Sequence, residues 1–121
     1  MEMSIRYCET KDNKGIFIVK FSINDFCRNY DEGVPCSFFI ECLGQGIEYM
    51  LQLNGKRTKR YLIGLNEFSI APDIDEYIAN EFRLEVQCLN IFRGFSKYSA
   101  DLVQNDKVLC HGVYSHCEKE E

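Results

Sequence analysis

The sequence has little of what marks several large functional classes. Its 14 basic and 19 acidic residues give a formal net charge of −5, whereas general nucleic-acid binding depends on a basic surface. No apolar run approaches the roughly 18–20 residues that span a bilayer, and residues 1–7 lack the apolar core of a secretion signal. We therefore expect a cytoplasmic protein with no membrane span and no nucleic-acid partner.

Histidine is also scarce, and the cysteines follow no metal-binding spacing. The seven cysteines include no C-x-x-C pair, so without a secretion signal we expect reduced thiols rather than a disulfide framework. The only histidines each adjoin a cysteine, in Cys110-His111 and His116-Cys117, but neighbouring residues of a strand point to opposite faces. The Gly-Gln-Gly run at 44–46 lies inside a predicted helix and is not a nucleotide loop. We therefore expect neither a metal nor a cofactor.

Proline is limited to two residues, and no Pro-, Ser- or Gly-rich stretch divides the chain. The 121 residues are 45% hydrophobic and 13% aromatic, a composition typical of a globular domain that buries its own core. No internal repeat is found. The sequence therefore predicts one domain over residues 1–121.

Hydrophobic periodicity predicts one helix among six strands. A hairpin of strands 5–10 and 16–23 surrounds a turn at 11–15, and a loop at 24–34 leads to a helix at 37–53, which the Asn-Gly pair at 54–55 ends. Four strands follow, at 61–70, 82–91, 95–103 and 107–114, the last two joined by a turn at 105–106. The order β-β-α-β-β-β-β indicates an α+β protein in which one helix packs on a bent antiparallel sheet.

The predicted helix carries a single narrow polar stripe. The stripe recurs at i, i+4, i+7 and i+11 and consists of Glu41, Gln45, Glu48 and Gln52. Nearly all other positions are apolar or small, so we expect the helix to be covered on most of its circumference. Gly44 and Gly46 each lower helix propensity by about 1 kcal/mol, and we expect them to let another stretch of backbone come close.

Four segments, in order, resemble a known family. Residues 33–45, GVPCSFFIECLGQ, are similar to the Pro-Gly-x-x-x-x-Glu-x-x-x-Gln segment of β-hydroxyacyl-acyl-carrier-protein dehydratases. Residues 61–68, with Gly64, resemble the family's aromatic-x-x-Gly-hydrophobic-Asp/Asn strand, and residues 82–86 and 93–98 resemble the strands and turn after it. The resemblance covers most of the chain and implies the hot-dog fold, in which a long central helix is wrapped by the sheet.

The resemblance implies a function and site residues. It implies an enzyme of the 3-hydroxyacyl-acyl-carrier-protein dehydratase-like group, which is a lyase of fatty-acid or polyketide-type metabolism. It also implies a homodimer or a higher even oligomer. Carried over by position, the catalytic acid is Glu41, and the backbone N–H that polarises the thioester carbonyl belongs to Cys36. The helix glutamine of the family is Gln45, and Gly64 contributes to substrate binding.

One departure from the family affects the chemistry. Fourteen residues before Glu41, where the family has its catalytic histidine, this chain has Cys27. Cys27 is either a nucleophile or base or, as an alternative, a plain loop or core thiol. Two other functions stay open: an acyl-CoA or acyl-carrier-protein thioesterase that uses Glu41 alone, and a catalytically silent subunit that binds acyl chains or a carrier protein. Glu41 is then only part of a solvent-facing stripe.

The remaining candidates are basic. The dense basic run at 56–60 is interpreted as a dock for an acidic carrier protein or for the phosphate of phosphopantetheine or CoA. The alternative is a solvated loop whose positive charge offsets the negative end of the helix dipole. Two basic residues further along the chain extend the dock. Its members are Lys56, Arg57, Lys59, Arg60, Arg93 and Lys97.

Overall fold

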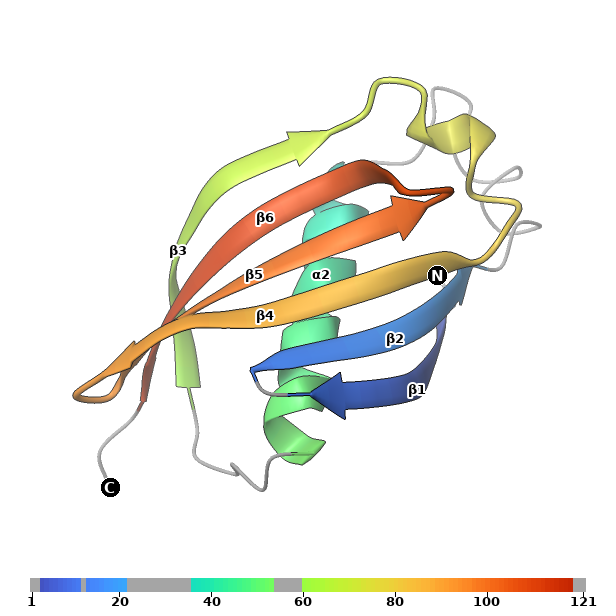
Figure 1. The fold of residues 1–121 in the computed structure, drawn as a ribbon. Helices are drawn as coiled ribbons and strands as arrows, with labels where there is room; N and C mark the ends of the chain where they lie inside the picture. Colours follow the sequence, from blue (N-terminus) through green and yellow to red (C-terminus); the bar gives the residue numbers. More distant parts are fainter. Residues whose placement is uncertain (1–2, 12, 22–35, 54–59, 119–121) are drawn as a thin grey trace.

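A computed structural model describes residues 3–11, 13–21, 36–53 and 60–118, and it contains the predicted order of elements (Figure 1). Strands and helices follow the chain as β1 (Met3–Lys11), β2 (Lys14–Phe21), α2 (Cys36–Leu53), β3 (Arg60–Ile70), the short 3-10 helix η1 (Ile74–Glu76), β4 (Phe82–Phe92), β5 (Phe95–Gln104) and β6 (Lys107–Glu118). The predicted architecture, one helix on a bent antiparallel sheet, is confirmed.

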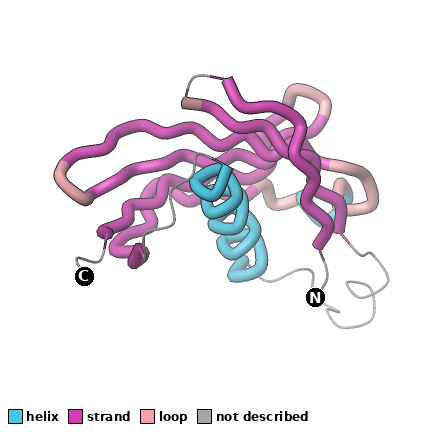
Figure 2. The backbone as a smooth tube through the Cα atoms, turned by 90° about the horizontal axis from the view of Figure 1, so that it is seen from below, coloured by secondary structure: helices cyan, strands magenta, loops and turns pink. Residues whose placement is uncertain are grey.

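The six described strands form one sheet in the order β1-β2-β4-β5-β6-β3, and all neighbours are antiparallel. The chain leaves β2, forms α2 and continues into β3 at the far edge, so β4 returns to pair with β2. Figure 2 shows the sheet curving over α2. We call the side of the sheet that faces α2 the inner face and the opposite side the outer face.

Two hairpins use two-residue turns. The turn at Asn105 and Asp106 was predicted, and both residues have positive φ values, 52° and 62°, as a twisted hairpin turn requires. A similar turn at Arg93 and Gly94, with φ values of 46° and 81°, joins β4 to β5. Gly94 takes this conformation without the steric cost that a side chain would bring.

Some predicted boundaries are wrong. The first hairpin turn does not reach Gly15, because β1 and β2 stay paired from Thr10↔Gly15 to Lys11↔Lys14. Gly15 also pairs with β4 and is buried. The predicted break after β3 contains η1, whose Ile74 joins the core. Strand β6 continues four residues past Tyr114, because β3 and β5 both extend alongside it.

The core lies between α2 and the inner face of the sheet. Eight helix residues are buried: Phe38, Phe39, Cys42, Leu43, Gly46, Ile47, Met50 and Leu51. A Cβ at Gly46 would lie 2.5 Å from Cδ2 of Leu84 on β4, so this glycine permits a close approach by a side chain rather than by the backbone that the sequence predicted. At the other end of the contact, the hydroxyl of Tyr114 on β6 donates a hydrogen bond to the backbone carbonyl of Ile40 and ties the sheet to the helix.

Candidate functional site

Helix α2 begins at Cys36, the residue predicted to supply the thioester-binding N–H. The first backbone N–H groups of a helix have no acceptor within it, and they carry the positive end of the helix dipole. Cys36 and Ser37 are exposed. The end of the helix can therefore donate a hydrogen bond to a carbonyl oxygen or to an oxyanion.

Glu41 lies on the exposed face of α2. All four members of the predicted polar stripe, Glu41, Gln45, Glu48 and Gln52, are exposed in this single chain, as the alternative of a solvent-facing stripe predicted. Cys36 and Glu41 are five residues apart, about 7.5 Å along the helix axis. Five residues turn a helix by about 140°, so Glu41 lies on a different side of α2 from Cys36. Because helical side chains lean toward the N-terminus, the Glu41 side chain extends from its Cα toward the Cys36 end of the helix.

The predicted basic dock is only partly within the described residues. Lys56, Arg57 and Lys59 lie outside them, as does Cys27. Arg60 starts β3, but its side chain is only 4% exposed, and its Nη2 lies 3.6 Å from Oε2 of Glu48.

The other basic candidates lie elsewhere. The guanidinium of Arg93, in the β4–β5 turn, lies 5.2 Å from the ring centroid of Phe92. Lys97 is exposed on the outer face of β5, opposite to Arg60. The described residues therefore do not bring Arg60 and Lys97 onto one surface. Gly64, half-buried on β3, follows a bulge opposite Ser115.

Neither histidine lies next to Glu41. His111 is on the outer face, where its Nδ1 hydrogen-bonds to Oδ1 of Asp101 on β5. His116 is buried on the inner face, and burial lowers the pKa of its imidazole, an effect to which Arg60 adds and which Glu48 opposes. Glu48 lies about two helical turns beyond Glu41. Within the described part of the chain, no histidine takes the place of the family's catalytic base.

Two thiols near the helix are inert. Burial raises the pKa of Cys42 far above its ordinary value, and the neighbouring Cys110 and Glu41 raise it further. Burial, with Asp101 and Cys36 nearby, raises the pKa of Cys110 to about 12. Both thiols therefore stay protonated and act as small core residues.

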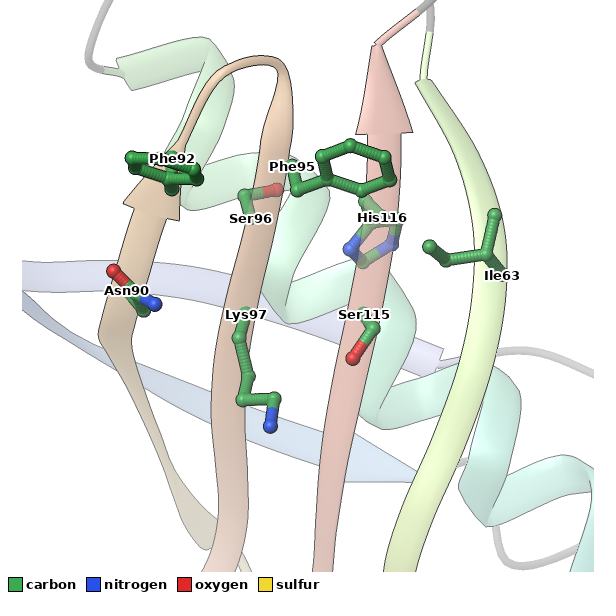
Figure 3. A pocket seen from close by; sticks show the side chains of 8 residues that line it. All are labelled: Ile63, Asn90, Phe92, Phe95, Ser96, Lys97, Ser115 and His116. Carbon is green, nitrogen blue, oxygen red and sulfur yellow. The ribbon is translucent and has the colours of Figure 1, made fainter.

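The sequence did not predict a shallow groove of about 200 Å³ on the sheet near the β4–β5 turn. Its side chains, shown in Figure 3, come from β4, β5, β6 and β3, which are adjacent in the sheet. They are Ile63, Asn90, Phe92, Phe95, Ser96, Lys97, Ser115 and His116. The groove is made by strand register, which joins residues far apart in sequence, so no local motif marks it.

No family model and no curated protein sequence matches the chain. Several solved structures, by contrast, are similar to the chain in fold. A Streptococcus mutans protein bound to acetyl CoA has a TM-score of 0.74 and 7% identity, covering 98% of this chain and 90% of that one. A mutant of a hypothetical thioesterase from Streptococcus pneumoniae has a TM-score of 0.71 and 10% identity, covering 99% and 93%. The dehydratase heterocomplex ApeI:P from Xenorhabdus doucetiae has a TM-score of 0.67 and 15% identity, covering 96% and 82%.

Identities this low show the fold alone. No described helix is long and apolar enough to cross a membrane. The thioesterase and dehydratase structures share one helix wrapped by an antiparallel sheet, as the sequence resemblance predicted. The chain therefore has the hot-dog fold.

Proposed function

We propose that this protein is an acyl-thioester enzyme and that it hydrolyses its substrate. The observation that carries the proposal is the place of the Glu41 carboxylate in the first half of α2, the helix whose exposed N-terminal end begins at Cys36. We propose that a thioester carbonyl bound at the Cys36 N–H is polarised there and that Glu41 activates the attacking water. The positions of the two histidines favour hydrolysis over dehydration, since neither is available to remove a proton beside the carbonyl.

The proposed reaction uses the two groups in sequence. The Glu41 carboxylate accepts a proton from water while the water oxygen attacks the thioester carbon, and the Cys36 N–H donates a hydrogen bond to the oxyanion that forms. When the oxyanion collapses, the carbon–sulfur bond breaks, and the proton held by Glu41 passes to the departing thiolate. A free acid and a free thiol are released. Gln45, one turn along the same face, is proposed to position the water.

We propose a CoA thioester as the substrate, supported by the similar structure bound to acetyl CoA. A mass-spectrometric assay on saturated and 3-hydroxyacyl thioesters, each on CoA and on acyl carrier protein, tests both the chemistry and the carrier. Release of free acid supports hydrolysis. Loss of water would instead identify a dehydratase without the usual histidine. If neither product forms, the catalytic proposal is wrong, and the silent-subunit alternative applies.

We also propose that two copies join through β3. This edge strand exposes three consecutive apolar residues, Tyr61, Leu62 and Ile63, at 53%, 52% and 57%, and exposed apolar edge strands pair with other chains. A β3–β3 contact continues the sheet and covers Tyr61 and Ile63, while Leu62, the direct partner of His116, stays on the inner face. Tyr61→Lys combined with Ile63→Lys is expected to halve the mass measured by sedimentation, whereas Val108→Lys, an exposed residue of β6, is expected to leave it unchanged. An unchanged mass in the β3 variant would contradict this interface.

A further inference from the structure

A second polar site lies on the inner face of the sheet, near the C-terminal half of α2. The Arg60 side chain is 4% exposed, yet its Nε and Nη1 have no hydrogen-bond partner among the described residues. His116 is 7% exposed, and its Nδ1 also lacks a described partner. The hydroxyl oxygen of Ser96 is also buried and has no hydrogen-bond partner among the described residues.

Strand register brings these groups together. His116 pairs directly with Ser96 on β5 and with Leu62 on β3, and Arg60 is two residues before Leu62 on the same strand. Direct partners and i, i+2 neighbours share one face of a sheet. The ring of His116 also lies 6.3 Å from that of Tyr98, measured between centroids. Figure 3 shows Ser96 and His116 on adjacent strands.

Most of the described unpartnered buried atoms therefore gather in one place. Five such side-chain atoms occur, and four of them belong to Arg60, Ser96 and His116. A buried polar group without a partner is destabilising, and native proteins rarely concentrate several of them. Glu48 satisfies the cluster only in part, because its carboxylate is half exposed and lies 3.6 Å from Nη2, beyond a normal hydrogen bond.

The chemistry of the cluster selects an oxyanion. Arg60 offers only donors, the Ser96 hydroxyl is a donor, and His116 donates from one of its ring nitrogens. Carboxylate and phosphate oxygens are the acceptors that a guanidinium binds best. Next to the cluster the same face is apolar and open: Leu62 is 52% exposed, and Ile91, the direct partner of Ser96, is 51% exposed.

We propose that Arg60, Ser96 and His116 form a binding site for an oxyanion headgroup carried on an alkyl chain, with the chain lying over Leu62 and Ile91. A fatty carboxylate and an alkyl phosphate share this chemistry. Glu48 is twelve residues from Cys36, about 18 Å along the helix. The site is therefore separate from the thioester site, and the inference does not rest on the proposed hydrolysis.

The two histidines provide a local readout of binding. With ¹⁵N in the imidazole rings only, the spectrum contains signals from His111 and His116, and a His111→Gln variant assigns them. Octanoate and octyl phosphate are titrated separately, and acetate serves as the probe without a chain. We expect at least one amphiphile to move the His116 signals saturably while those of His111, on the outer face, stay fixed. Acetate is expected to bind at least about tenfold more weakly, because it leaves Leu62 and Ile91 uncovered.

Variants decide whether the cluster is the site. Arg60→Lys keeps the charge but removes the guanidinium donors, and it is expected to weaken binding about tenfold or more. The control Arg83→Lys changes an exposed arginine on the outer face and is expected to leave affinity unchanged. If Arg60→Lys does not fold, Ser96→Ala provides the same test, and it is likewise expected to weaken binding. His116 signals that no amphiphile moves, equal shifts at both histidines, or unchanged affinity in these variants would overturn the proposal. The tighter of the two amphiphiles identifies the headgroup.

Discussion

Replacing Gly46 of α2 by alanine is expected to destabilise the protein, whereas the same change at Gly44 is expected to stabilise it. Alanine is favoured over glycine inside a helix by about 1 kcal/mol, and this gain is common to both variants. The surroundings differ. A Cβ at Gly44 meets one atom within 4 Å, Cε2 of Tyr114 at 3.6 Å, which is an ordinary contact.

At Gly46 the added carbon is obstructed. It would lie 2.5 Å from Cδ2 and 3.1 Å from Cγ of Leu84, and 3.2 Å from Cγ2 of Val86. Leu84 and Val86 are fully buried, so neither has free space into which to move. Overpacking of this kind costs about 1–3 kcal/mol. The gain in helix propensity offsets part of it, and the net loss at Gly46 is about 1 kcal/mol.

Urea denaturation of the two variants measures the packing cost directly, since helix propensity cancels in their difference. We expect Gly44→Ala to exceed Gly46→Ala in free energy of unfolding by about 1–3 kcal/mol at unchanged m-value. A double-mutant cycle with Leu84→Ala should show that the cost at Gly46 falls when the obstructing side chain is removed. Equal stabilisation in both glycine variants would refute the close contact between α2 and β4.

Two further predictions concern the inner face of the sheet. Tyr114→Phe removes the hydrogen bond to the Ile40 carbonyl. We expect the free energy of unfolding to fall by about 1–2 kcal/mol in the same urea assay. An unchanged free energy of unfolding would show that this bond does not anchor the helix. The pKa of His116 is lowered mainly by burial, so the unfolded chain takes up a proton near pH 6.5 while the folded protein resists it. Stability should therefore fall as the pH drops below about 6.5, and His116→Gln should make the fall shallower; parallel curves for the two proteins would contradict the assigned cause.

Much of the fold could be predicted because its patterns are local. The stripe of α2 repeats with helical period, and all its members are exposed as expected. The alternation of Phe82, Leu84, Val86 and Cys88 with polar residues likewise predicts which side of β4 is buried. The first three are fully buried, and Cys88 is partly buried. The turn at Asn105 and Asp106 follows from residues that tolerate positive φ.

What the sequence did not show depends on register between distant strands. Arg60 stands in a basic run and was predicted to be a surface residue of a dock, but strand register places it on the inner face, where its side chain is only 4% exposed. His116 has no local pattern that distinguishes it from His111, yet the two lie on opposite faces. Bulges in β3, between Leu62 and Gly64 and again after Asn66, shift which side chains face inward, and alternation alone cannot locate them.

The catalytic role of Glu41 is tested most directly by a matched pair of variants on one helix. Glu41→Gln and Glu48→Gln remove equal charge from the same exposed stripe, but Glu41 is about 7.5 Å and Glu48 about 18 Å along the helix axis from Cys36. On a thioester that the protein hydrolyses, we expect kcat/KM to fall about 10²–10⁴-fold in Glu41→Gln and to change less than about threefold in Glu48→Gln. Hydrolysis that survives in Glu41→Gln, or that falls equally in both variants, would contradict the proposed mechanism.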